Sequence, residues 1–91
     1  MNNFRMVDQL IRCATSIGAN IAESNGNYVG RERYHLGIAS ASANEVRFWV
    51  DRAYRKGYID KITFERLDEK AQEIRRMIAG MLKRLKNEKS A

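Results

Sequence analysis

Apolar residues recur at helical spacing along three segments of the chain. In the first segment, from about Phe4 to Ser24, they stand three and four residues apart and form one stripe of a helix: Val7, Leu10, Ile11, Ala14, Ile17, Gly18 and Ile21. Gly18 lies within this stripe, although a glycine inside a helix costs about 1 kcal/mol relative to alanine. We therefore expect another helix to approach the first one closely at Gly18.

Residues that favour turns separate the three segments. Asn25-Gly26-Asn27 ends the first helix, because Asn and Gly tolerate the left-handed conformation of a helix C-cap, and the linker extends to Gly30. Gly57 is the expected C-cap of the second helix, and Asp60 is the expected N-cap of the third. Such short links are typical of antiparallel neighbours in a bundle.

The second helix, from about Arg31 to Lys56, is apolar over most of its circumference. One face carries Tyr34, Ile38, Ala41, Phe48 and Trp49. A helix that is apolar on several sides is buried on several sides, and two neighbouring helices cannot cover all of them. We therefore predict that this helix also contacts another chain, although a satellite core under the linker is an alternative. We assign the interface to the second apolar face, with Leu36, Ala39, Ala43, Val46 and Val50.

The third helix runs from about Lys61 to Asn87 and has the most regular pattern. Its apolar stripe has Met77 at the edge and consists of Phe64, Leu67, Ala71, Ile74, Ile78, Met81, Leu82 and Leu85. From Leu67 onward the spacing alternates between four and three, which is the heptad pattern of bundle packing. The sequence thus predicts an all-α antiparallel bundle of three long helices, formed by residues 1–91 as a single domain.

Positive charge adds one candidate function. The net charge of +6 favours polyanions such as RNA, DNA or acidic protein surfaces, although it can also serve solubility alone. The densest basic region is the end of the third helix, where cations also stabilise the helix dipole. Because no aromatic residues alternate with these cations, we expect no sequence-specific base readout. The candidate nucleic-acid contacts are Arg76, Lys83, Arg84, Lys86 and Lys89.

The residues that carry chemistry are few. Cys13 is the single cysteine and His35 the single histidine, so neither a disulfide nor a zinc site can be built within the chain, and we interpret Cys13 as a small buried residue. Glu45 needs a partner if it is buried, and Arg12 or Arg52 could supply it. We predict no catalytic residue, no metal site and no cofactor. With no run of about 18 apolar residues and no signal peptide, we expect a cytoplasmic protein without membrane contact.

The segment from Gln9 to Ser24, Q-L-I-R-C-A-T-S-I-G-A-N-I-A-E-S, resembles a known signature, Q-I-R-R-A-x-S-I-P-A-N-I-A-E-G. This signature belongs to a bacterial four-helix-bundle family that includes the proteins encoded in 23S rRNA intervening sequences. The accessory variability determinants (Avd) of diversity-generating retroelements are related to this family. The resemblance implies structural roles for Arg12, Asn20, Glu23 and Glu45. Asn20 would form a cap or a hydrogen bond across helices, and Glu45 would pair with Arg12.

The resemblance also implies an assembly and partners. Gly18 and Ser24 stand where the family often has Pro and Gly, and the helix that precedes the signature in the family has no counterpart in these 91 residues. Three helices of four would leave an apolar surface exposed. Family members resemble non-enzymatic rings, typically pentamers, and the retroelement branch binds nucleic acid and a reverse transcriptase. The alternative is a structural assembly protein of the rRNA branch, with no specific nucleic-acid ligand.

Overall fold

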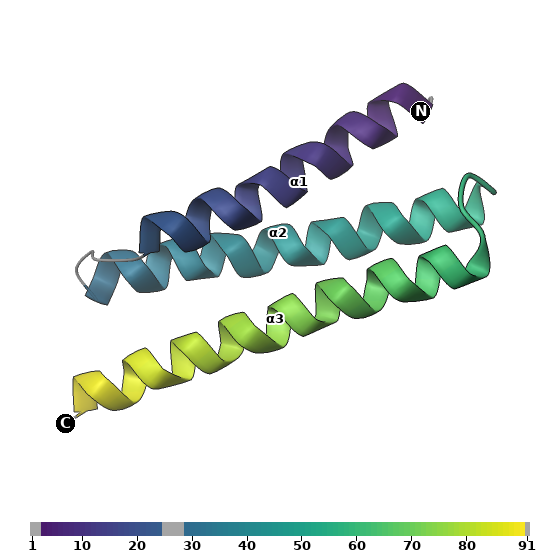
Figure 1. The fold of residues 1–91 in the computed structure, drawn as a ribbon. Helices are drawn as coiled ribbons and strands as arrows, with labels where there is room; N and C mark the ends of the chain where they lie inside the picture. The colour runs from purple at the N-terminus through teal and green to yellow at the C-terminus, as the bar shows by residue number, and fades with distance from the viewer. Residues whose placement is uncertain (1–2, 25–28, 91) are drawn as a thin grey trace.

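Residues 3–24 and 29–90 are described by the computed structural model of the protein. They form three α-helices, which are α1 (Asn3–Ser24), α2 (Val29–Arg55) and α3 (Lys61–Ser90). The ribbon in Figure 1 is elongated, with extents of 50 × 21 × 14 Å. The predicted all-α bundle of three long helices is confirmed.

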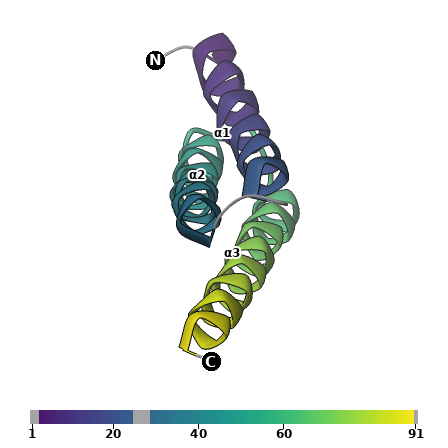
Figure 2. The ribbon, with the colours of Figure 1, turned by 90° about the vertical axis from the view of Figure 1, so that its left-hand side faces the viewer.

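The central helix is α2. Both α1 and α3 pack antiparallel against it, and no Cα atom of α1 lies within 8 Å of a Cα atom of α3 among the described residues. Figures 1 and 2 show that α1 and α3 diverge from α2 at opposite ends of the molecule. The fold is therefore an open arrangement in which two helices share one neighbour.

The core forms where α3 meets the first half of α2. Leu36 and Ala39 of α2 pack with Ile78 and Leu85 of α3, and partly buried side chains surround them: Ile21, Ile74, Met81 and Leu82. Ala71 is also buried. From Ala71 to Leu85 the heptad stripe predicted for α3 therefore faces the core, because burial of this stripe against α2 removes apolar surface from water. Leu67, where the predicted heptad begins, is 38% exposed.

The stripe predicted for α1 is only partly correct. The buried side chains of α1 include Met6, Cys13 and Ile17, whereas Val7 and Ile11 are 47% and 59% exposed. Because α1 packs against α2 alone, it turns one edge of its apolar surface to α2 and leaves the other edge open. The close helix approach expected at Gly18 is absent within the described residues, since a Cβ atom at this position would meet nothing within 4 Å.

The face of α2 that we assigned to an interface between chains lies inside the single chain. Four of its five residues are at most 2% exposed and the fifth, Val46, is partly buried, which corrects this assignment for Leu36, Ala39, Ala43 and Val50. The reason is that α1 and α3 flank this face and cover it. The exposed apolar face of α2 is the other one, where Tyr34 is 65% and Phe48 49% exposed.

The link between α2 and α3 follows the prediction. Gly57 has a φ of 79°, and its N–H donates to the carbonyl of Tyr54 over 3.0 Å, while the N–H of Tyr58 donates to the carbonyl of Ala53 over 2.9 Å. These two bonds form a Schellman motif, which requires a left-handed residue at the position of Gly57. Helix α2 thus ends at Arg55, and Gly57 forms the cap that the sequence predicted.

The start of α3 is capped as expected. The Oδ1 atom of Asp60 accepts a hydrogen bond from the N–H of Thr63 over 2.8 Å, and the hydrogen bonds from Thr63 lower the pKa of the Asp60 carboxyl. The helix end predicted at Asn25-Gly26-Asn27 lies outside the described residues. Helix α2 begins at Val29, two residues before the predicted start at Arg31.

Candidate functional site

A row of hydrogen-bonded polar side chains joins α1 to α2, and we call it the polar seam. Its α1 members stand three and four residues apart and therefore share one face of the helix. The bonds connect the thiol of Cys13 to Oε2 of Glu45 (3.1 Å), the hydroxyl of Ser42 to Oγ of Ser16 (2.8 Å), and Nδ1 of His35 to Oδ1 of Asn20 (2.9 Å). The polar seam fixes the register of α1 against α2, because the two side chains of each hydrogen bond must lie at the same height along the two helices.

Two of the family positions have roles that the structure specifies. Asn20 forms the hydrogen bond across helices that the resemblance implied. Glu45 does not form the expected ion pair with Arg12, because no nitrogen of Arg12 lies within 4.0 Å of its carboxylate and its hydrogen-bond partner is the thiol of Cys13. Arg52 lies instead over the ring of Phe48, 5.5 Å from its centroid. Arg12 and Glu23, the other two family positions, are exposed.

The polar seam does not supply a nucleophile. Burial raises the pKa of the Cys13 thiol to about 11, and its hydrogen bond to the Glu45 carboxylate acts in the same direction. The thiol is therefore protonated near neutral pH and stays unreactive. Among residues 3–24 and 29–90, no three His, Cys, Asp or Glu side chains are grouped as metal ligands would be. No helix in the same ranges is both long enough and apolar enough to cross a membrane.

The candidate nucleic-acid contacts spread around one half of α3. Successive residues of an α-helix are about 100° apart, so Arg76 and Lys83 share one face of α3, and Lys86 and Arg84 flank this face on opposite sides. Arg84 borders a hollow next to Met77. Lys89 lies outside the residues whose side chains are described.

Arg75 lies on the same side of α3 as Lys86, although it was not among the predicted nucleic-acid contacts. It lines a shallow hollow with Gln72, Arg76 and Ala79. Its Nε atom is buried and has no hydrogen-bond partner in the described part of the chain. Arg76 is already paired with Glu69, over 2.7 Å. The Arg75-Arg76 dipeptide was the signal that could have drawn attention to this position.

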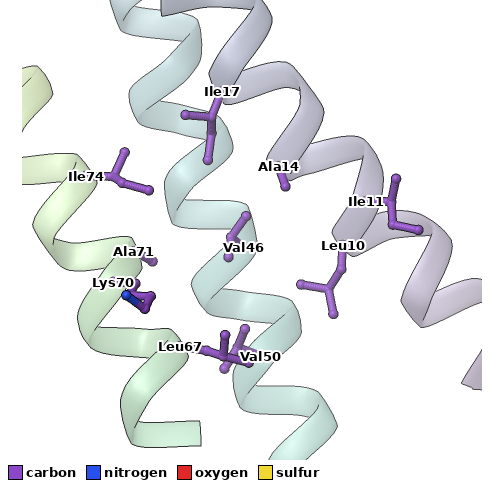
Figure 3. Close-up of a pocket in the computed structure, with 10 residues that line it drawn as sticks. All are labelled: Leu10, Ile11, Ala14, Ile17, Val46, Val50, Leu67, Lys70, Ala71 and Ile74. Carbon is purple, nitrogen blue, oxygen red and sulfur yellow. The ribbon is translucent and has the colours of Figure 1, made fainter. Parts of the chain in front are cut away.

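An apolar groove of about 430 Å³ separates α1 from α3. Val46 and Val50 of α2 form its floor in Figure 3, and Lys70 is its one charged lining residue. The other lining residues are Leu10, Ile11, Ala14, Ile17, Leu67, Ala71 and Ile74. The groove is therefore lined almost entirely by apolar side chains, which come from all three helices.

The fold and these surfaces define a class of protein. It is a small all-helical bundle with a basic helix end and apolar surface left open on two sides. The chain belongs to the 23S rRNA-intervening sequence protein family, whose sequence model matches residues 1–80.

A solved structure shows the same fold. It is that of a protein of unknown function from the S23 ribosomal protein family of Bacteroides thetaiotaomicron. It is 32% identical in sequence to this chain, with a TM-score of 0.82, and the similarity covers 86% of this chain and 70% of the other. The comparison with curated proteins found no match.

Proposed function

We propose that this protein is a non-enzymatic, self-associating scaffold that contacts nucleic-acid phosphates through the end of α3. The observation that carries this proposal is the segregation of charge. Residues 75–91 contain six basic residues and one acidic residue, and so account for five of the six net positive charges of the chain. A helix end with this charge density attracts a phosphate backbone and releases its counterions.

The proposed contact recognises the charge and shape of the nucleic acid and not its base sequence. Phosphate contacts position a protein on nucleic acid but carry no sequence information directly. Stacking of single-stranded bases needs aromatic side chains, and the region from Arg75 to Lys89 has none. RNA and DNA should therefore bind with similar strength, with Lys83 and Lys86 as the main contacts and Arg75 beside them.

Self-association is supported by the apolar surface that stays open. Exposed apolar surface is found on two sides of this small chain, at the groove and along α2, and contiguous patches of this kind mark interaction sites. The resemblance to Avd favours a ring of five and a reverse transcriptase as the protein partner, in the cytoplasm.

A second candidate function has one observation in its favour, which is the family match itself. On this alternative, the protein is an assembly protein of the rRNA-insert branch, and its charge serves solubility without a nucleic-acid ligand. The two functions differ in one measurable property, because only the first predicts binding that weakens with salt.

The test is fluorescence anisotropy of labelled RNA and DNA oligonucleotides between about 50 and about 200 mM salt. The test variant carries Lys83→Glu, Arg84→Glu and Lys86→Glu. A matched control with the same net charge carries Arg12→Glu, Lys56→Glu and Arg66→Glu at exposed positions outside the basic end. We expect the test variant to lose about tenfold or more in affinity and to show a shallower salt dependence, and the control to lose less. Equal losses would reject the end of α3 as the binding surface, and no binding of the unmodified protein at low salt would favour the alternative.

A further inference from the structure

Arg75 differs from the other arginines at the basic end of α3. It is partly buried, whereas Arg76 and Arg84 are exposed. Its Nε atom is buried and has no hydrogen-bond partner among the described residues. Its guanidinium also forms no ion pair within residues 3–24 and 29–90. Buried donors without an acceptor are rare in folded proteins, and a bound ion is one explanation for them.

The carboxylate that Arg75 could reach along α3 is already occupied. Arg76 pairs with Glu69, seven residues before it, and the residue seven before Arg75 is Asp68. Oδ1 of Asp68 accepts a hydrogen bond from Nε of Arg47 over 2.9 Å, and its Oδ2 accepts a second one from α3 over 2.9 Å. The positions three and four residues away from Arg75 hold no acid: Ala71, Gln72, Ile78 and Ala79. Along α3, Arg75 thus has no carboxylate left to pair with.

A hollow of about 190 Å³ opens beside the Arg75 side chain, and Gln72, Arg76 and Ala79 line it as well. At about 100° per residue, these four positions lie within about 100° of one another around α3. The small side chain of Ala79 leaves room between the two arginines. The hollow is several times larger than the about 30 Å³ that one water molecule occupies in the liquid. It therefore has space for a small anion next to two cations, and none of its four lining residues is acidic.

We propose that this hollow holds one phosphate group of the bound nucleic acid, and that Arg75 binds it through two parallel N–H donors. A guanidinium is planar and always charged, and its donors match two oxygens of one phosphate. With Nε as one of these donors, the phosphate supplies the acceptor that the chain lacks, once the side chain turns outward into the hollow. This inference rests on the proposed function and names the residue that fixes a phosphate in place.

Arg75 and the lysines of the basic end would then have different roles. Lys83 and Lys86 follow Ala79 by about 6 and about 10 Å along the axis of α3, so a backbone with one phosphate in the hollow can continue past both. A lysine ammonium is a point charge on a flexible stem. The side chain of Arg75 is already restricted by its partial burial, so it loses less conformational entropy on binding. The lysines therefore supply attraction, and Arg75 sets the position of the phosphate backbone on α3.

The first test compares two variants that keep the net charge of the chain. Arg75→Lys removes the paired donors of the hollow, and Arg76→Lys is the matched control, because Arg76 is exposed and already engaged with Glu69. In fluorescence anisotropy with a labelled RNA oligonucleotide at about 50 mM salt, we expect Arg75→Lys to lose about tenfold in affinity and Arg76→Lys less than about twofold. Equal losses, or none in Arg75→Lys, would overturn the inference while leaving the proposed function in place. No binding by the unmodified chain would overturn both.

A second test separates phosphate binding from a structural role of Arg75. Arg75→Leu removes the unpaired buried donor, so its thermal unfolding temperature should equal or exceed that of the unmodified chain, although its affinity for RNA falls. In NMR spectra of the nitrogen-15-labelled chain, the Nε–H resonance that is missing in Arg75→Lys should shift when inorganic phosphate is added, and not with sodium chloride at equal ionic strength. A lower unfolding temperature in Arg75→Leu, or a resonance that phosphate does not shift, would assign Arg75 a structural role and overturn the inference.

Discussion

Nδ1 of His35 in α2 donates a hydrogen bond to Oδ1 of Asn20 in α1 over 2.9 Å. The direction follows from the other end of the amide, because Nδ2 of Asn20 donates to the carbonyl of Ser16 over 2.9 Å and Oδ1 is left as the acceptor. The single histidine is thus tied to the signature segment of α1. Its imidazole therefore joins two helices.

Removing one member of this bond should destabilise the fold. Asn20→Leu leaves the N–H of a partly buried imidazole without an acceptor, and we expect a loss of about 1–3 kcal/mol in the free energy of unfolding. The double variant Asn20→Leu, His35→Leu should recover part of that loss, because no unpaired donor remains. Urea unfolding of the four proteins in this cycle gives the coupling energy. Asn44→Leu, at an exposed position of α2, is the control and should change stability little.

The thiol of Cys13 should be protected in the folded state. Its pKa of about 11 lies above the ordinary value of 9.0, so the folded state favours the protonated form. The resulting stabilisation is complete below pH 9 and falls as the pH rises from 9 toward 11, where the unfolded chain ionises first. We expect the difference in unfolding free energy between the unmodified chain and Cys13→Ala to shrink over this range. Fast labelling of the native thiol at pH 8 would contradict the assignment.

Much of the fold could be predicted from the sequence because the signals were local. The heptad stripe of α3 and the caps at Gly57 and Asp60 depend on neighbouring residues, and all three are present in the structure. The orientations of α1 and α2 were harder to predict, since both helices carry more apolar residues than one neighbour covers. Which of two apolar faces is buried depends on where the other helices lie, and this is not a local property.

The sites were predicted less well for a similar reason. The cross-helix bond of Asn20 was expected, but its partner His35 and the bond from Cys13 to Glu45 depend on the register of α1 against α2. The angle of about 100° between Lys83 and Arg84 around α3 could have been read from the helical period.

Truncation of Ile78 to alanine should destabilise the fold much more than truncation of its neighbour Met77. Ile78 is 1% exposed in the α2–α3 cluster, so Ile78→Ala should cost about 2–5 kcal/mol through lost burial and the cavity left behind. Met77 precedes it in the same helix turn but is 64% exposed, and Met77→Ala should change stability by less than about 1 kcal/mol. Chemical unfolding of both variants measures the contrast. Similar losses at the two positions would mean that Met77 is buried in an assembly.

Acid should weaken the ion pair between Arg47 of α2 and Asp68 of α3. The hydrogen bond from Nε of Arg47, 2.9 Å long, holds the pKa of the Asp68 carboxyl below its usual value of 3.8, and a hydrogen bond from Gln72 adds to it against the effect of burial. A lowered pKa gives stability that is present above pH 3.8 and is lost as the pH falls through the folded-state pKa. We expect Asp68→Asn to destabilise at pH 7 by about 1 kcal/mol and to differ less from the unmodified chain in acid. Asp51→Asn, in an exposed pair with Arg55, should show a smaller effect at both pH values.

Replacement of Gly18 and of Gly57 by alanine should have opposite effects on stability, because the first tests helix propensity and the second tests backbone conformation. Gly18 lies inside α1 with free space where a Cβ atom would be, so Gly18→Ala should raise the unfolding free energy by about 1 kcal/mol and the melting temperature by about 4–8 °C. Gly57 has a φ of 79°, which L-residues rarely adopt, and Gly57→Ala should lower stability by a comparable amount even though its surroundings are also open. Thermal melts followed by circular dichroism measure both. If Gly18→Ala lowers stability instead, a helix of another chain packs against α1 at this point, because within the single chain nothing opposes the added methyl group.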